Sequence, residues 1–247
     1  MKWIKITGNI LKITWLLFWA AMATIVLFVP ITLAAFCSRT GNLSFTISKV
    51  WAWMVRLAAF VRVDITGKEN IQKGQSYVII SNHQSFFDII ALVTTLGIQY
   101  RWIIKQELLK VPLFGYALYA SRNIFIDRSN SQRARQSIKK GIDRLPGGAS
   151  ILFFAEGTRQ PPGTLGQFKK GGFMVAMQND LPILPVTVNG SAKVLPRKGV
   201  VFSPGKIHVV VDRPIITEGY DRDNLEELME KTRGVIGANM TFSFIQE

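Results

Sequence analysis

A histidine and an aspartate lie five residues apart in the segment NHQSFFD, directly after a β-rich run. Histidine is the side chain whose ordinary pKa suits proton transfer near neutral pH, and a carboxylate on one ring nitrogen fixes the tautomer and stabilises the imidazolium. Residues five apart on one helix point about 140° away from each other. We therefore expect His83 in the loop or first turn, with Asp88 one turn inside the helix and within reach of a ring nitrogen.

Three other strand-like runs are followed by charged residues. The run FFAEGTRQ contains Gly157, which permits a tight bend, and Arg159, whose planar guanidinium can hold two phosphate oxygens at once. The run NIFIDR ends in Arg128, and Lys105 follows RWII. Together these residues are predicted to line one cationic rim that holds a phosphomonoester.

The elements that must position these residues follow one another from about Asp64 onward. Short β-rich runs alternate with amphipathic stretches, which predicts an α/β fold with a mostly parallel or mixed sheet covered by helices. Sites in such sheets collect at the carboxyl ends of strands, where the polar turns lie. The runs are, in order, YVIIS, DIIALVTTL, RWIIK, QELLKVPLFGYALY, NIFID, SQRARQSIKKGIDRL, ILFFA, FKKGGFMVAMQN, ILPVTV, KIHVVVD and DNLEELMEKTRGVIG.

The N-terminal part of the chain is apolar and basic. Residues 13–29 carry no charge, and with the apolar residues that follow them the run is about long enough to cross a bilayer. A second apolar run over residues 45–63 is interrupted by Lys49 and Arg56, which favours a position in the headgroup layer of an anionic membrane. No acidic residue occurs before Asp64.

These features predict a helical hairpin that embeds residues 1–62 in a membrane and an α/β domain over residues 63–247. Basic residues flank the first apolar run on both sides, so both ends are expected on the cytoplasmic side. Because Pro30 readily kinks or ends a helix, a hairpin within one leaflet is favoured over a single full span. An ordinary transmembrane anchor stays open as the alternative.

The composition narrows the possible partners. A formal net charge of +14 over 247 residues concentrates anions at the surface, and nucleic acid or anionic lipid would both fit. No nucleic-acid-binding module is present, so lipid is favoured; the basic residues after Asn130 are interpreted as a solvated helix face. One cysteine and two histidines argue against a structural metal site, and no metal is expected.

Taken together, NHQSFFD, IFIDR, EGTR and LPILPV occur in the order and approximate spacing of the glycerolipid acyltransferase family. The stretches KQELLKVPLFG and FKKGGF extend the resemblance, which covers about residues 60–215 and is strongest to the bacterial 1-acyl-sn-glycerol-3-phosphate acyltransferases. Two positions depart from the family pattern. Ala155 stands where proline is usual, and Arg122 stands near a common glycine.

This resemblance implies transfer of a fatty acyl group from acyl-CoA or acyl carrier protein to the sn-2 hydroxyl of lysophosphatidic acid, with no cofactor. It implies that His83 is the general base, that Asp88 orients it, and that anionic membrane lipid surrounds the enzyme at the cytoplasmic face of the membrane. The implied substrate-binding residues are Lys105, Arg128, Glu156, Gly157, Thr158 and Arg159.

Several alternatives remain at this point. The acceptor could be glycerol-3-phosphate or another lysolipid, and the chain could bind anionic lipid without catalysis. A serine hydrolase is disfavoured because no G-x-S-x-G turn is present. Glu156 and Arg159 could form a simple surface ion pair. His208, on an alternating strand, is interpreted as structural or surface-exposed.

Overall fold

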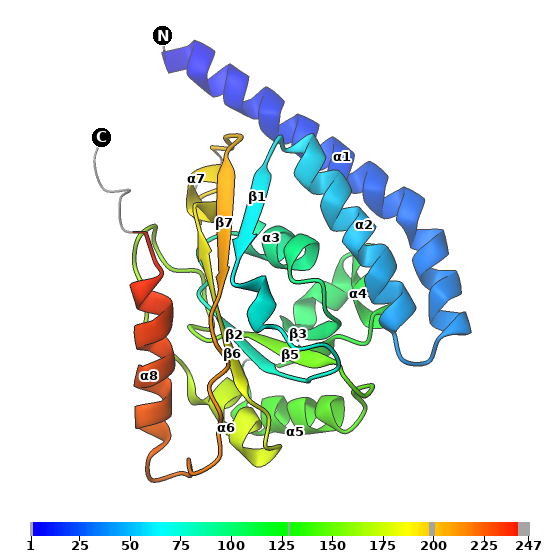
Figure 1. The fold of residues 1–247 in the computed structure, drawn as a ribbon. Helices are drawn as coiled ribbons and strands as arrows, with labels where there is room; N and C mark the ends of the chain where they lie inside the picture. The colour runs from blue at the N-terminus through cyan, green and yellow to red at the C-terminus, as the bar shows by residue number, and fades with distance from the viewer. Residues whose placement is uncertain (1, 128, 198–200, 242–247) are drawn as a thin grey trace.

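The chain folds around one twisted sheet whose strands come from most of its length (Figure 1). The computed structural model describes residues 2–127, 129–197 and 201–241. Within these residues the sheet has seven strands in the order β1-β7-β6-β2-β5-β3-β4. Their bounds are β1 Arg62–Thr66, β2 Val78–Ser81, β3 Tyr100–Lys105, β4 Ile124–Ile126, β5 Ser150–Phe154, β6 Ile183–Asn189 and β7 Lys206–Val211.

The sheet is mixed, with a parallel majority. Strands β6, β2, β5, β3 and β4 pair in parallel, whereas β7 is antiparallel to β6 and β1 is parallel to β7. Every residue of β2 and β6 is buried, because helices cover both faces of the sheet. Burial on two faces explains why these strands read as continuous apolar runs rather than as alternating ones. The predicted α/β fold is confirmed.

Alternate residues of each central strand enter two different cores. Ile79 packs in the core beneath α2 and α3, while its neighbours Val78 and Ile80 pack in the opposite core with α6 and α8. The helices after the N-terminal element are η1 Lys68–Asn70, α3 Phe87–Thr95, η2 Gln106–Lys110, α4 Phe114–Ala120, α5 Ser131–Ile142, α6 Lys170–Gln178, α7 Ser191–Val194 and α8 Leu225–Ala238.

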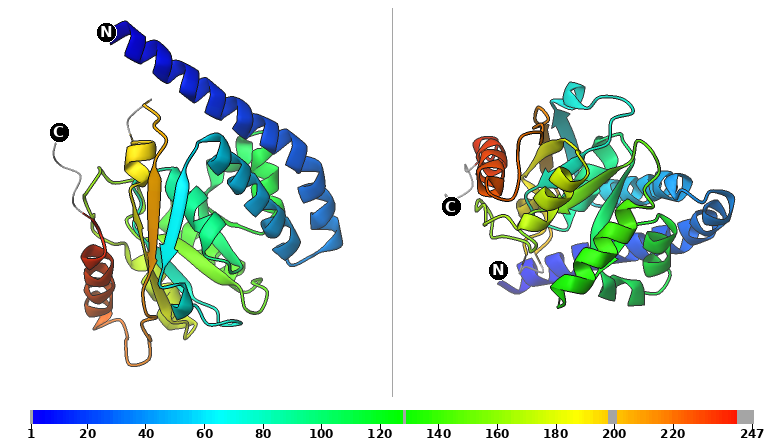
Figure 2. Two further views of the ribbon diagram at one scale, coloured as in Figure 1. Left: turned by 45° about the horizontal axis from the view of Figure 1, so that its top comes forward. Right: turned by 90° about the horizontal axis from the view of Figure 1, so that it is seen from below.

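Two helices precede the sheet and pack side by side along one of its flanks (Figures 1 and 2). Helix α1 spans Lys2–Cys37 and helix α2 spans Asn42–Ala58. At a rise of 1.5 Å per residue, α1 is about 54 Å long. Among the described helices, α1 is the one long and apolar enough to cross a membrane. Pro30 lies inside α1 and does not end it.

The predicted pair of N-terminal helices is therefore present, although α2 does not have the length and apolarity of a span. Helix α2 also contributes to the main core, because Phe45, Ala52 and Val55 are buried there together with residues of β2 and α3. The hairpin and the sheet thus share a core, and the division into domains at residues 62 and 63 stays a prediction.

Candidate active site

His83 and Asp88 lie together at the carboxyl end of β2. His83 follows β2 in the loop, and Asp88 is in the first turn of α3, as the spacing predicts. Nδ1 of His83 lies 2.8 Å from Oδ2 of Asp88, whose side chain is fully buried. The His83 ring stacks on Phe154 with a centroid separation of 3.8 Å and an interplanar angle of 10°. Asp88 therefore holds the imidazole at its Nδ1 edge, and Phe154 packs against one face of the ring.

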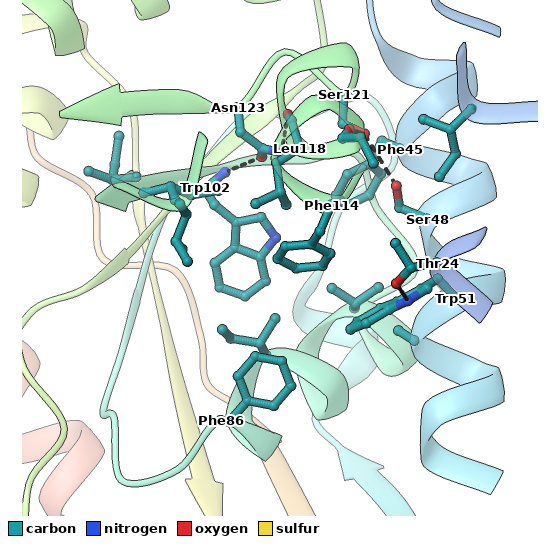
Figure 3. Close-up of a pocket in the computed structure, with 18 of the residues that line it drawn as sticks. Thr24, Phe45, Ser48, Trp51, Phe86, Trp102, Phe114, Leu118, Ser121 and Asn123 are labelled. Carbon is teal, nitrogen blue, oxygen red and sulfur yellow. Dashed lines mark hydrogen bonds between the residues drawn. The ribbon is translucent and has the colours of Figure 1, made fainter. Parts of the chain in front are cut away.

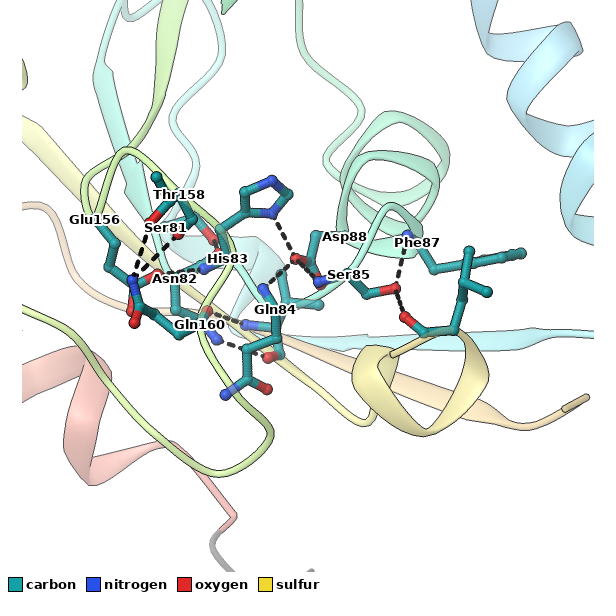
Figure 4. A network of polar contacts seen from close by, with 12 residues as sticks. Ser81, Asn82, His83, Gln84, Ser85, Phe87, Asp88, Glu156, Thr158 and Gln160 are labelled. Atoms are coloured by element: carbon teal, nitrogen blue, oxygen red, sulfur yellow. Dashed lines mark hydrogen bonds and ion pairs between the residues drawn. The ribbon is translucent and has the colours of Figure 1, made fainter. Parts of the chain in front are cut away.

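The hydrogen bonds of Asp88 define the tautomer of His83. Oδ2 of Asp88 also accepts from the backbone N–H groups of Gln84, at 2.7 Å, and Ser85, at 2.8 Å (Figure 4). A carboxylate offers only acceptors, so the proton of the shared hydrogen bond belongs to Nδ1 of His83. In the neutral imidazole this leaves the lone pair on Nε2, which is the form that a general base needs.

Glu156 fastens the loop that carries His83. Its Oε2 accepts the backbone N–H of His83 at 2.7 Å (Figure 4). Its Oε1 accepts the backbone N–H of Gly166 at 2.8 Å. The residue is only 4% exposed. Burial raises the pKa of the Glu156 carboxyl to about 7, against the opposing effect of these two hydrogen bonds. Glu156 therefore acts on His83 through the backbone, and its predicted contact with substrate stays a prediction.

Further polar side chains hold the same loop against the rest of the fold. Asn82 is fully buried and exchanges two hydrogen bonds with the backbone of Val188 in β6, at 2.8 and 2.9 Å. Gln84 donates to the carbonyl oxygens of Pro161 and Thr164, and the carbonyl of His83 accepts from the backbone N–H of residue 160. The base is thus positioned from β6, from α3 and from the loop after β5.

An apolar cavity of about 400 Å³ has His83 in its wall. It lies between residues of α1, α2 and α4 (Figure 3). This volume lies within the range of about 300–1,000 Å³ that is typical of small-molecule sites. Trp51, Phe86 and Phe114 form much of its wall, and the indole of Trp51 donates to the hydroxyl of Thr24. The surface of the cavity is mostly apolar, which suits a hydrocarbon chain.

A second pocket, of about 470 Å³, begins on the other side of His83 and is cationic. Arg159, Lys169 and Arg197 line it together with Gly157 and Thr158. None of the three cations forms an ion pair with a residue that the structure describes. This cationic pocket therefore offers unneutralised positive charge to an anion close to the imidazole.

Two structural features explain why a glycine fits at position 157. Its φ of +71° lies in the left-handed region, which glycine adopts without strain. A Cβ at this position would lie 2.8 Å from Cε of Lys169, so a larger residue would displace that side chain. The absence of a side chain at position 157 thus leaves room for the Lys169 side chain beside it.

The structure separates residues that the sequence was expected to bring into one rim. Lys105 borders the apolar cavity rather than the cationic pocket, and its Nζ lies 2.9 Å from the carboxylate of Glu107. Thr158 and Arg159 share one pocket, which Lys105 does not line, so the role of Lys105 in substrate binding stays a prediction. Arg128 lies outside the described residues.

The two departures from the family pattern have different structural settings. Ala155 donates its backbone N–H to the carbonyl of Ser81 at 3.2 Å, a hydrogen bond that proline could not make. Arg122 has a φ of +57°, which explains why glycine suits this region, and it lines a separate pocket of about 230 Å³ with Lys140 and Arg144. Arg122 thus neither extends nor blocks the cationic pocket.

Some residues of the site were missed by sequence reasoning. Lys169 and Arg197 were not predicted, although Lys169 lies in the quoted stretch FKKGGF. Asn82 and Gln84 also belong to a quoted motif, but nothing in their spacing reveals that their partners lie in β6 and after β5. The second histidine, His208, lies on β7 and contacts Thr66, away from both pockets.

Comparison with known proteins places this arrangement in a family. A family model described as Acyltransferase matches residues 62–189. The 1-acyl-sn-glycerol-3-phosphate acyltransferase of Pseudomonas aeruginosa is 35% identical over 189 residues, which cover 76% of this chain and 72% of that protein. The chloroplastic 1-acyl-sn-glycerol-3-phosphate acyltransferase BAT2 of Brassica napus is 34% identical over 68% of this chain.

The match spans about half the length of the plant relatives, 49% of BAT2 and 48% of LPAT1 of Arabidopsis thaliana. Among solved structures, the 1-acyl-sn-glycerophosphate acyltransferase PlsC of Thermotoga maritima aligns over 95% of both chains with a TM-score of 0.81 and 24% sequence identity. This likeness shows that the two chains share a fold, including the N-terminal helices. By the family match and the bacterial relative, the chain belongs to the acyltransferase family.

Proposed function

We propose that the protein transfers a fatty acyl group from an acyl thioester to the sn-2 hydroxyl of 1-acyl-glycerol-3-phosphate, which gives phosphatidic acid. The observation that carries this proposal is the position of the His83–Asp88 pair between an apolar cavity and a cationic pocket. An acyl chain and a phosphate are the two chemically different parts that such a reaction must hold near one base. The names of the relatives support the same reaction.

In the proposed mechanism, Nε2 of His83 removes the proton of the acceptor hydroxyl while its oxygen attacks the thioester carbonyl carbon. Asp88 stabilises the imidazolium that forms, and the proton then passes to the departing thiolate as the C–S bond breaks. The acceptor itself is the nucleophile, so no covalent enzyme intermediate is required. A base positioned in this way typically contributes roughly a hundred- to ten-thousand-fold to the rate.

The two pockets have different roles in this proposal. The cationic pocket holds the acceptor phosphate, with Arg159 as the side chain that can bind two of its oxygens and Lys169 and Arg197 as further charges. The apolar cavity holds a fatty acyl chain and keeps water away from the reacting thioester. The donor is acyl-CoA or acyl carrier protein, and no metal or other cofactor takes part.

Helix α1 is proposed to hold the enzyme at the membrane that contains its lipid substrate. The basic residues on both sides of its apolar run favour the cytoplasmic face. Pro30 does not end α1, so it gives no reason to favour the one-leaflet hairpin over a full span, and the length of the helix is sufficient for a span.

The test is acyl transfer by the purified, detergent-solubilised protein. Palmitoyl-CoA and palmitoyl-acyl carrier protein would each be offered with 1-acyl-glycerol-3-phosphate and, separately, with glycerol-3-phosphate. The His83→Ala variant should lose turnover. His208→Ala is the matched control, because it removes the chain's other histidine, which lies outside both pockets, and should keep turnover.

Each outcome decides a part of the proposal. Product from the lysolipid that disappears in His83→Ala alone would support both the reaction and the base. Full activity in His83→Ala would overturn the mechanism, and a preference for glycerol-3-phosphate would replace the acceptor. A wild-type protein that acts on neither acceptor with either donor would contradict the reaction and favour a lipid-binding role.

A further inference from the structure

A second exposed apolar surface lies outside helix α1, on residues 108–119. This segment contains the end of η2, the turn after it and most of α4. Six of its large apolar or aromatic side chains are between 37% and 54% exposed; they are Leu108, Leu109, Val111, Leu113, Tyr116 and Tyr119. Single exposed apolar residues are ordinary on a protein surface, but a contiguous group within twelve residues of chain marks an interaction surface.

The inner side of the same segment is also apolar. Leu108, Phe114 and Leu118 line the apolar cavity, and Phe114 packs on Trp51 of α2 with ring centroids 5.4 Å apart (Figure 3). The segment is thus a thin wall with apolar side chains on both sides. Contact between its outer side and water is unfavourable, so a covering that removes water would stabilise it.

The segment continues the apolar surface of α1. Helix α4 packs against α1, where the rings of Phe28 and Tyr116 lie 5.7 Å apart, and the right-hand view in Figure 2 shows the two helices next to each other. Val29 and Leu33 of α1 are exposed by 58% and 59%. Lipid that surrounds α1 at this level would therefore also reach α4.

The charges at the edge of the segment identify the occupant as a bilayer rather than a protein core. Lys110 and Arg122 are exposed and make no ion pair with a described residue. The one acidic residue of the sequence between positions 105 and 122 is Glu107, which Lys105 neutralises. Cations and tyrosines around an apolar centre are typical of surfaces in the headgroup layer of an anionic membrane.

We propose that residues 108–119 insert into the surface of an anionic lipid bilayer beside α1 and form a third membrane-contacting element. The wall of the apolar cavity then has lipid on its outer side. The proposal concerns binding alone and does not depend on which acyl transfer the protein performs.

The test uses fluorescence from single labelled cysteines in the full chain. Cys37 is the only cysteine, so Cys37→Ser provides a background without thiols. Leu109→Cys would carry a polarity-sensitive fluorophore, with Val29→Cys on α1 as the positive control. Arg222→Cys is the matched negative control, because Arg222 is exposed in the loop before α8. Helix α8 covers the face of the sheet opposite α1 (Figure 1).

The labelled proteins would be reconstituted into vesicles of phosphatidylethanolamine and phosphatidylglycerol with brominated acyl chains. An element that enters roughly 5–10 Å into the boundary between headgroups and chains should show a blue-shifted emission at Leu109 and at least about half of the quenching at Val29. Arg222 should remain unquenched. Thermal unfolding of each variant in detergent controls for folding.

Two results would overturn the proposal. Quenching at Val29 with none at Leu109 would leave the segment in water. Shielding of Leu109 in detergent before vesicles are added, growing with protein concentration, would mean that a second copy of the chain covers the surface instead. Neither readout uses acyl transfer, so failure here is distinguishable from failure of the proposed reaction.

Discussion

Replacing Glu156 by glutamine should weaken both the fold and the site, because one buried side chain serves two backbone groups. The two oxygens of its carboxyl group accept from the N–H groups of His83, at 2.7 Å, and Gly166, at 2.8 Å, and each oxygen has a lone pair for this whether the group is ionised or protonated. A glutamine has one acceptor oxygen, so its NH₂ group must face one of the two N–H groups. A buried donor left without a partner costs about 1–3 kcal/mol.

That loss predicts a lower melting temperature for Glu156→Gln. In a chain of this length about 1 kcal/mol corresponds to roughly 2–4 °C, so the expected fall is roughly 2–12 °C in detergent. Turnover should fall as well, since misplacing a catalytic group by about 1 Å can cost roughly a hundred-fold in rate. Glu226→Gln is the matched control, because its side chain is 81% exposed and its ion pair with Lys170 is worth little.

The pH dependence provides a second, independent signature. Burial raises the pKa of Glu156 to about 7, above the ordinary value of 4.5. Below pH 4.5 both the folded and the unfolded chain carry this proton; between 4.5 and 7 the unfolded chain has lost it and the folded chain keeps it. The contribution of Glu156 to stability is therefore fully present below pH 4.5 and is lost as the pH rises through 7.

Melting temperatures of the wild type and Glu156→Gln would be measured from pH 4.5 to pH 8. The glutamine has no such proton, so its deficit should be largest near pH 4.5 and shrink toward pH 8, with a slope of at most about 1.4 kcal/mol per pH unit. Equal melting temperatures for the variant and the wild type at every pH would refute the reasoning about the two hydrogen bonds. A lower melting temperature whose difference from the wild type does not change with pH would refute the reasoning about the pKa.

Three further substitutions test the other parts of the site. Asp88→Asn keeps the shape but removes the charge that stabilises the imidazolium of His83, so kcat should fall roughly a hundred- to ten-thousand-fold with little change in KM; an unchanged kcat would count against the pair. Gly157→Ala places a Cβ on a residue with a left-handed backbone, 2.8 Å from the Lys169 side chain. The change should destabilise the fold by roughly 1–3 kcal/mol and raise the KM for the lysolipid. Thermal unfolding and steady-state kinetics would measure these effects, and an unchanged melting temperature would contradict the strain. Arg159→Lys should raise the KM for the lysolipid more than that for the acyl donor, because an ammonium cannot bind two oxygens in one plane; equal effects on both would argue against a phosphate role.

Local features of the sequence were sufficient to predict the fold class and the central pair. Apolar runs of four to seven residues, separated by amphipathic stretches, require a sheet covered on both faces, and β2 and β6 are buried throughout. Residues five apart point away from each other on one helix, so His83 and Asp88 can meet only if His83 lies in the loop before the helix and Asp88 in its first turn. The length and apolarity of α1 are likewise properties of one continuous segment.

The tertiary structure alone decided which distant residues share a pocket. Strand β2 pairs with β5 and β6, and this neighbourhood brings Glu156 and Val188 to a loop that precedes them by 73 and 106 residues. Strand order depends on how the crossover connections close and on the packing of whole layers, so no local period encodes it.

The same reason separates Lys105 from Arg159. Both residues follow a strand in the sequence, yet Lys105 turns toward α4 and pairs with Glu107, whereas Arg159 turns toward Lys169 and Arg197. Sequence spacing determined that charged groups would lie at the ends of strands. Only the packed helices on either face decided that His83 would stand between an apolar cavity and a cationic pocket, because each face of the sheet is covered by different elements.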